Sequence, residues 1–476
     1  MEQIAGLPLS PVSGPTLCRS QRRIRGRVRP RTAADVAAVV RACAEQRWPL
    51  HPVSGGKNWG MGSYLPDHDD CVLLDLSALK TIGPIDRDAG SVRIEAGVTQ
   101  KELYDWLQRE APEFAFNVTG AGKDTSIVGN ALERGLGYLG SRAGEIFGCA
   151  AVLADGTEVG PDPAWFSRTG CIPAGPQTEV LFAQGNLGVV TSVWLKLRRR
   201  QELEAAVVIS GEFEPVFETV RRAMECNVLT LPVHMGGGSR LDGLGLGFLR
   251  QLWDREPSVD DVRRIFPLSR GHTALGALHG PKRLVRAAVA ELRSLAAPGT
   301  VIRVVTDARF RWAERWCSRF GLRDKATFFA ALRPLFALTW GEANDAGLAA
   351  LGMPLREVNP DRLGTGCIYL NAVTAPRVEA SRAVERLLAE HAPDHAVTRC
   401  FEGRMLVHVM SIFFPPEAAA DAQDRARSLA RAFRAQGWPP YRLGQVTMEA
   451  VPGVLAARLR AALDPHHLIA PGHYVA

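Results

Sequence analysis

The chain has 476 residues, of which 46% are hydrophobic and 22% charged, and its net charge is +7. That length exceeds one ordinary hydrophobic core, so we expect two domains, and the charge balance excludes a disordered chain. No apolar run is long enough to cross a bilayer, and residues 1–15 lack the pattern of a secretory signal. The nine cysteines form no CxxC pair, which argues against a zinc site or a disulfide framework and favours a reducing cytoplasm.

An arginine-rich run lies near the beginning of the chain. Its members are Arg19, Arg22, Arg23, Arg25, Arg27, Arg29 and Arg31. Such a run is typical of a solvated or partly ion-paired strand, of a phosphate contact or of a nucleic-acid surface. Because no aromatic residues alternate with these arginines, we favour the strand and expect no nucleic-acid partner.

Residues 30–200 are predicted to fold as one unit. Thr32 and Asp35 form a capping-box signature at the beginning of a helix that Pro49 ends, and Thr99 and Glu102 form a second one. The predicted strands are Leu50–Val53, Cys71–Leu76, a segment around Val92 and Ile94, Cys149–Ala154 and Leu187–Leu197. Asp155-Gly156 is typical of a hairpin turn.

The first glycine-rich segment, Ser54–Gly62, follows a strand and leads to another strand. In a nicotinamide-binding Rossmann unit, such a loop joins a strand to a helix. The order of elements therefore argues against a nicotinamide site.

The rest of the chain alternates differently. Residues 201 to about 430 carry predicted strands and amphipathic helices, typical of an α+β domain whose sheet is covered by helices. The predicted strands are Ala205–Ile209, Val301–Val305, Ile368–Val373 and Met405–Phe414, and the predicted helices include Pro281–Leu295 and Val378–Glu390. The tail from Gly437 onward carries one more helix, Val454–Leu463.

Three segments could present backbone donors to a polar ligand: His51–Gly62, Thr119–Tyr138 and Gln184–Thr191. Glycines permit unusual φ angles and a close approach of the backbone, and consecutive N–H groups can surround a pyrophosphate. Each segment alone is equally typical of an ordinary loop.

Taken in this order, these segments resemble the vanillyl-alcohol oxidase and p-cresol methylhydroxylase (PCMH) family, and its 4-phenol-oxidising branch in particular. The block Gly129–Tyr138, the hairpin Leu153–Gly156 and the tail Ala462–Gly472 carry the same resemblance. It implies an α+β, two-domain PCMH-type FAD-binding fold. The implied parts are an FAD-binding domain (1–200), a substrate or cap domain (201–436) and a C-terminal segment (437–476) that returns to the FAD domain.

The resemblance also implies which residues hold FAD. Those at the pyrophosphate would be Ser54, Gly55, Gly56, Lys57, Asn58 and Trp59. Those beside the flavin and its ribityl chain would be Gly120, Gly122, Ser126, Gly129 and Asn130, and Val190 would contact the adenine end. No metal is expected.

Tyr441 and Arg442 resemble the family pair that binds a phenolate oxygen. A guanidinium and a phenol hydroxyl can stabilise an oxyanion, whereas an Arg beside an aromatic residue is also typical of a surface stack. Trp59 stands where vanillyl-alcohol oxidases carry a second tyrosine of the oxyanion site, and a Trp offers only an N–H donor.

Three further residues complete the predicted site. His408 matches a family position on a strand that faces the flavin, and it is either a base or a packed core histidine. Arg404, four residues earlier, is expected on the same strand, and Tyr138 is expected at the ring side of the pocket.

Two positions depart from the family pattern. Ile368 stands where many relatives carry a flavin-linking histidine, so we predict non-covalent FAD. Ala121 stands where the family has an acid near flavin N5, and Asp124 could replace that acid only after a local shift.

These observations predict an FAD-dependent oxidoreductase that oxidises a phenolic or conjugated small molecule by hydride transfer, in secondary or aromatic metabolism. The alternatives are an FAD-bound redox-neutral cyclase or lyase, a non-catalytic flavin-binding or ligand-binding protein, and an alcohol or sugar oxidase of the wider superfamily. The expected partners are a small-molecule substrate and, as a homodimer, a second copy of the chain, with no membrane.

Overall fold

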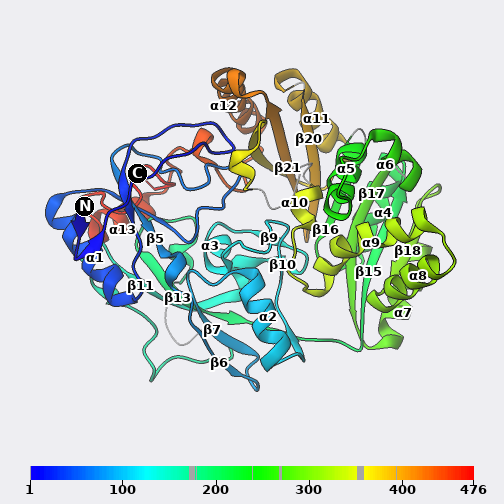
Figure 1. Ribbon diagram of the computed structural model, residues 1–476, viewed down its shortest axis with the longest axis horizontal. Helices are drawn as coiled ribbons and strands as arrows, with labels where there is room; N and C mark the ends of the chain where they lie inside the picture. The colour runs from blue at the N-terminus through cyan, green and yellow to red at the C-terminus, as the bar shows by residue number, and fades with distance from the viewer. Residues whose placement is uncertain are drawn as a thin grey trace.

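The computed structural model describes residues 2–475 except 171–176, 178, 238–239, 267–270, 351–358 and 393. The chain forms two main bodies of sheet and helix, and both termini lie on the same side of the molecule (Figure 1). Among the described residues, no helix has the length and apolar character needed to cross a membrane.

The chain begins with a small parallel sheet of three strands in the order β3-β5-β4. These are β3 (Ile24–Val28), β4 (Leu50–Val53) and β5 (Cys71–Asp75), with α1 (Ala33–Gln46) between the first two. The capping box of Thr32 and Asp35 is present, and α1 buries its Val36, Val39 and Val40 side chains. Apolar spacing and the cap together explain why this helix forms and where it begins.

The arginine-rich run includes β3. Arg23 pairs with Asp70 at 3.0 Å, and Asp75 lies 2.9 Å from Arg29 and 3.8 Å from Arg27. The partly ion-paired strand is thus the interpretation that the structure favours.

An antiparallel sheet of five strands follows, in the order β12-β11-β13-β7-β6. Its strands are β6 (Ile82–Asp86), β7 (Ser91–Glu95), β11 (Ile146–Val152), β12 (Glu158–Val159) and β13 (Val189–Lys196). The elements between them are α2 (Gln100–Glu110), β8 (Phe114–Ala115), α3 (Ile127–Leu132), β9 (Leu136–Gly137) and β10 (Gly140–Ser141). The second capping box begins α2, and Gly156 has the positive φ of a hairpin turn.

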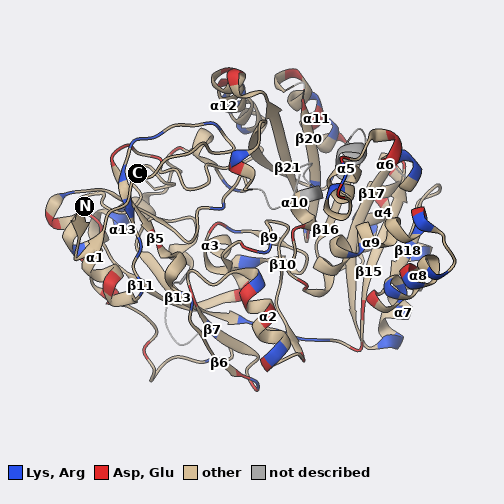
Figure 2. Ribbon diagram, viewed as in Figure 1, with Lys and Arg blue, Asp and Glu red and all other residues tan. Residues whose placement is uncertain are grey.

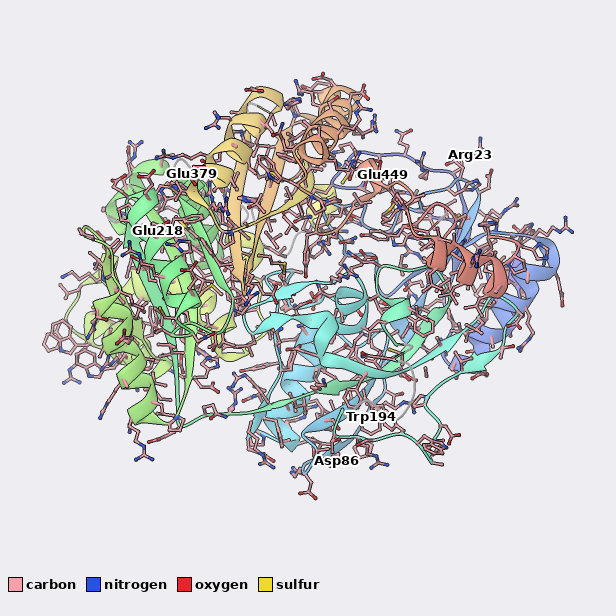
Figure 3. The ribbon with its side chains drawn as sticks, turned by 180° about the vertical axis from the view of Figure 1, so that it is seen from behind. Arg23, Asp86, Trp194, Glu218, Glu379 and Glu449 are labelled. Carbon is pink, nitrogen blue, oxygen red and sulfur yellow. The ribbon has the colours of Figure 1, made fainter. Side chains whose placement is uncertain are left out.

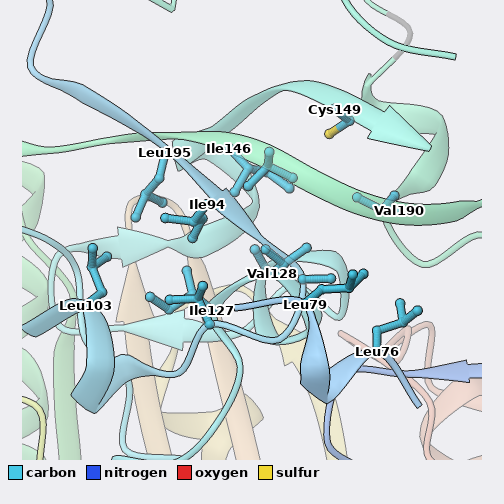
Figure 4. Close-up of a cluster of buried hydrophobic side chains, with 14 of the residues drawn as sticks. Leu76, Leu79, Ile94, Leu103, Ile127, Val128, Ile146, Cys149, Val190 and Leu195 are labelled. Atoms are coloured by element: carbon cyan, nitrogen blue, oxygen red, sulfur yellow. The ribbon is translucent and has the colours of Figure 1, made fainter. Parts of the chain in front are cut away.

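One apolar core joins these two sheets to α1, α2 and α3. Its centre contains Leu76, Leu79, Ile94, Ile127 and Leu195, all buried (Figure 4). On the outer side of the five-stranded sheet, the Trp194 ring lies under the Arg168 guanidinium at 5.3 Å (Figure 3). The core fixes the loops that leave the sheets, and those loops reach the cavity described below.

An antiparallel sheet of seven strands forms the second body, in the order β18-β15-β17-β16-β20-β21-β19. Its strands are β15 (Leu203–Gly211), β16 (Val233–Gly237), β17 (His272–Gly280), β18 (Val301–Val305), β19 (Gly366–Thr374), β20 (His395–Glu402) and β21 (Met405–Phe414). The sequence predicted β15, β18, β19 and β21 and missed the other three. The missed strands include glycines or charged residues, which weaken the strand pattern.

Helices cover both faces of this sheet. One face carries α4 (Phe213–Glu225), α7 (Lys282–Ser294), α11 (Val378–His391) and α12 (Ala419–Ala435). Glu218 of α4 and Glu379 of α11 lie on this outer layer (Figure 3). The other face carries α5 (Arg240–Leu252), α6 (Val259–Ile265), α8 (Asp307–Arg319), α9 (Arg323–Ala337) and α10 (Ala346–Ala350). Charged residues are frequent along these helices (Figure 2).

The C-terminal tail contacts both bodies. Pro440 forms a bridge with Ala372 of β19, and Ile469, beyond α13 (Val454–Leu463), forms a bridge with Leu50 of β4. The tail therefore passes between the seven-stranded sheet and the N-terminal body. The boundaries at residues 200 and 436 stay predictions.

Candidate functional site

A cavity of about 680 Å³ lies between the glycine-rich loops, the C-terminal tail and one face of the seven-stranded sheet. Its volume is in the range of cofactor and ligand pockets. All three predicted loop segments, far apart in sequence, contribute to its lining.

The first loop contributes its backbone. Ser54, Gly55, Gly56, Lys57, Asn58 and Trp59 all line the cavity. Gly55 and Gly56 have φ values of +142° and +68°, and a Cβ on Gly56 would stand 2.7 Å from Cβ of Tyr64. The loop can follow this path because these two positions carry no side chain.

The second loop contacts the first. Gly120, Ser126, Gly129 and Asn130 line the cavity, as does Val190 from β13. A Cβ on Gly129 would stand 3.2 Å from Ser54, so the two loops approach closely there. Gly122 lies outside the cavity lining. Its carbonyl accepts a hydrogen bond from Gln100, and its Cα faces Leu348.

Several buried polar atoms of the lining fit a polar cofactor. His51 Nδ1, Thr119 Oγ1, Asn130 Oδ1 and Asn186 Oδ1 have no hydrogen-bond partner among the described residues. A buried polar atom without a partner is unfavourable, so such atoms indicate a ligand that satisfies them. The hydroxyl, amide and amino groups of FAD are suitable partners.

Tyr441 and Arg442 reach the cavity from the tail. Gln184 Nε2 donates to the Tyr441 carbonyl at 3.3 Å, and Arg442 Nη1 donates to the Glu133 carbonyl at 3.3 Å. Burial raises the pKa of the Tyr441 phenol, so this hydroxyl stays protonated and can donate. Arg442 keeps further N–H groups that can bind an anion.

An aromatic wall stands between the two bodies. The Tyr138 and His234 rings lie 4.6 Å apart, and both line the cavity with Trp59. Burial lowers the pKa of His234 to about 4, so its imidazole is neutral at neutral pH. Cys400 Sγ lies 3.9 Å from His234 Nε2. Sequence reasoning missed His234 and Cys400, because their strands were not recognised.

The structure does not bring His408 and Arg404 into the site, contrary to the sequence-based expectation. In β21, Val409 faces the cavity, so His408 lies on the opposite face of the sheet. There, His408 Nε2 lies 3.0 Å from Thr374 Oγ1, and burial lowers its pKa to about 3. Arg404 is exposed in the turn between β20 and β21.

Strand β19 shows the same alternation. Tyr369 and Asn371 line the cavity, whereas Ile368 packs in the core under α12. The Tyr369 N–H donates to the Gly60 carbonyl at 2.7 Å, which joins β19 to the first loop. Ile368 therefore does not occupy a flavin-facing position, and its identity no longer supports non-covalent attachment, which stays a prediction.

Asp124 does not take the predicted place beside Ala121 in the cavity lining. Ala121 lines the cavity, but Asp124 is exposed and lies 3.9 Å from Lys57. The carboxylates that do line the cavity are Asp67 and Glu133.

Asp67 and Glu133 both bind one histidine of the tail. His473 Nδ1 lies 2.7 Å from Asp67, and its Nε2 lies 3.2 Å from Glu133. Burial lowers the pKa of His473, but the two carboxylates outweigh burial and raise it to about 10. Burial opposes the ionisation of Glu133, yet His473 holds its pKa below the usual value. This cluster fixes the tail against α3 and the first loop. No local sequence pattern marks this cluster, because the three residues are far apart along the chain.

Several known proteins are similar to this chain in sequence or fold. An FAD binding domain model matches residues 24–160. The 1'-carboxy-chondrochloren decarboxylase of Chondromyces crocatus is 27% identical over 95% of this chain and 90% of its own length. The 4-cresol dehydrogenase [hydroxylating] flavoprotein subunit of Pseudomonas putida is 33% identical over 34% of this chain and 33% of its own length.

Two solved structures share the fold. The 4-ethylphenol oxidase from Gulosibacter chungangensis superposes with a TM-score of 0.79 at 22% identity, covering 95% of this chain and 89% of its own. p-Cresol methylhydroxylase superposes with a TM-score of 0.78 at 21% identity, covering 98% and 91%. At these identities, the likeness concerns the fold alone.

Proposed function

We propose that this FAD-dependent oxidoreductase belongs to the vanillyl-alcohol oxidase and p-cresol methylhydroxylase family and oxidises a phenolic small molecule. The position of Tyr441 and Arg442 in the cavity carries the proposal. A protonated phenol and a guanidinium on one ligand oxygen favour its anionic form, because both donate hydrogen bonds to it.

The residues of the chain bind and orient the substrate. Arg442 and Tyr441 hold the phenolate oxygen, and the Trp59 and Tyr138 rings enclose the aromatic ring. When bound, FAD supplies a two-electron acceptor for a hydride from carbon. A 4-alkylphenolate that loses a hydride from its benzylic carbon becomes a neutral quinone methide, because the electron pair of the oxygen fills the conjugated system.

A second candidate is oxidative decarboxylation, which the near full-length similarity to the decarboxylase of Chondromyces crocatus favours. If a carboxylate stands on the carbon next to the benzylic carbon, the quinone methide can lose CO2. The electron pair of the broken C–C bond then forms the vinyl double bond and restores the phenolate. The same oxyanion site would serve both reactions.

Anaerobic mixing of the holoprotein with 4-ethylphenol tests the first candidate. We expect the flavin absorbance to bleach. Arg442→Lys should slow bleaching on the order of a hundredfold, because less of the bound phenol would be in its reactive phenolate form. Tyr441→Phe should slow bleaching about tenfold, because the phenolate oxygen loses one hydrogen bond. Arg404→Lys is the matched control, since Arg404 is exposed outside the cavity. A flavin that remains oxidised with phenols while substrate turns over would instead favour a redox-neutral reaction.

Anaerobic mixing with 3-(4-hydroxyphenyl)propanoate tests the second candidate. Oxidative decarboxylation would give 4-vinylphenol and CO2 in a one-to-one ratio with reduced flavin. Bleaching without release of CO2 would exclude decarboxylation of this probe and leave simple phenol oxidation.

A further inference from the structure

The cavity extends much farther along the seven-stranded sheet than a small phenol requires. Residues paired across five neighbouring strands line it in one row: Arg303, Val208, Leu275, His234 and Cys400. Lining residues of a second row are Ser210, Thr273, Gly236, Thr398, Val409 and Asn371. With a spacing of about 4.8 Å between strands, the lining from β19 to β18 covers roughly 29 Å.

The two ends of this lining differ. The first glycine-rich loop lies at the β19 end, where the Tyr369 N–H donates to the Gly60 carbonyl and Pro440 forms a bridge with Ala372. The Tyr441 hydroxyl lies 3.5 Å from Ser141 Oγ, and the Ser141 N–H donates to Glu402 at the end of β20. Strands β17, β15 and β18 form the other end, which we call the apolar arm. The flavin loops do not pair with these three strands.

The apolar arm is roofed by phenylalanines. They are Phe248 of α5, Phe266 after α6, Phe310 of α8, and Phe328, Phe329 and Phe336 of α9. Val208, Leu275 and Val305 form the apolar part of the floor beneath this roof, beside the neighbouring hydroxyls of Ser210 and Thr273, which lie 3.5 Å apart. Aromatic and aliphatic side chains on both sides suit an apolar ligand, because such a ligand loses no hydrogen bonds on entry.

The far end of the arm reaches the edge of the seven-stranded sheet. Strand β18 is the edge of the sheet, and Arg303 on it is exposed while still lining the cavity. A ligand longer than the arm could therefore continue into solvent at this point.

We propose that the apolar arm holds a long, unbranched apolar tail of the substrate, while the phenolic head of the same molecule lies against Tyr441 and Arg442. The head position rests on the proposed function, whereas the tail position rests on the lining of the arm alone. The substrate class is thus a phenol whose para substituent carries an extended hydrocarbon-like chain.

A chain-length series tests the proposal with the holoprotein. The probes are 4-ethylphenol, 4-nonylphenol and 4-dodecylphenol, with equilibrium binding and anaerobic flavin bleaching as separate readouts. The longer chains are needed because β15 lies roughly 14 Å from β20, at about 4.8 Å per strand. Each methylene buried in the arm should raise affinity about threefold to fourfold, so 4-nonylphenol should bind at least about tenfold more tightly than 4-ethylphenol.

The variant Val208→Trp should fill the arm, because Val208 lines it on the strand next to the β18 edge. We expect this variant to lose the gain with chain length while its affinity for 4-ethylphenol stays within twofold of the wild type. Val301→Trp is the control, since Val301 is exposed on β18 and lies outside the lining. If Val208→Trp does not fold, Thr273→Phe on β17 tests the same prediction.

Equal affinity across the series, or weaker binding of the longer phenols, would overturn the proposal. A chain-length gain that Val208→Trp leaves intact would also overturn it. If the longer phenols bind more tightly but none of them bleaches the flavin, the result supports tail binding in the arm and contradicts the proposed phenol oxidation.

Discussion

The glycine-rich loops and the seven-stranded sheet line the same cavity in different ways. The loops combine glycine backbone with polar side chains such as Thr119 and Asn130, and their path depends on positions such as Gly56, where φ is +68°. The sheet presents side chains of one face, such as Val409, while the neighbouring His408 points to the other face. A change at a loop glycine should therefore disturb cofactor binding, whereas a change in the sheet should act only through the face on which the residue lies.

The largest effect is expected in the first loop. Gly56→Ala would place a Cβ 2.7 Å from Tyr64 and impose a left-handed conformation that costs about 1–3 kcal/mol. We expect FAD affinity to fall at least about tenfold, measured by equilibrium titration of the apoprotein with FAD. Gly364→Ala is the matched control, because Gly364 is exposed, has no positive φ and has no atom within 4 Å of an added Cβ. Equal FAD affinity in both variants would contradict the role of the Gly56 backbone.

The next largest effect is expected on the free energy of unfolding, at the junction between the loops and the C-terminal tail. His473 has a pKa of about 10 in the folded chain against an ordinary value of 6.5. Its proton therefore stabilises the fold fully below about pH 6.5, and this contribution is lost as the pH rises toward 10. His473→Gln should lower the free energy of unfolding on the order of 3 kcal/mol near pH 6, because it leaves two buried carboxylates unpaired.

Denaturant unfolding at several pH values measures this difference. The difference in the free energy of unfolding between the wild type and His473→Gln should decrease from pH 6 to pH 10. His466→Gln is the control, since His466 is exposed. If this difference does not change with pH, the proton on His473 contributes nothing to the stability of the fold.

The same contrast explains what could be predicted from the sequence. Capping boxes and glycine spacing are local signals, so α1, α2 and the lining residues of the first loop were predictable. The face of a strand depends on register, and a shift of one residue exchanges the two faces. For that reason the resemblance placed His408 and Ile368 toward the flavin, and the structure places both away from it. The His473 cluster and the apolar arm join residues that only the folded chain brings together, so no local pattern marks them.

The smallest effects are expected from substitutions of two histidines that lie on opposite faces of the seven-stranded sheet. The His234 ring packs against Tyr138 at a tilt of 45° inside the cavity, whereas His408 forms a hydrogen bond with Thr374 beneath α11 and α12. We expect His234→Gln to raise the KM for 4-ethylphenol several-fold, because the aromatic wall loses a ring. His408→Gln should change kcat/KM less than twofold and lower the free energy of unfolding by about 1 kcal/mol, the contribution of one hydrogen bond. Steady-state kinetics and denaturant unfolding of both variants measure this. A large loss of kcat in His408→Gln with unchanged stability would return His408 to the catalytic site and show that the register assigned to β21 does not describe the active protein.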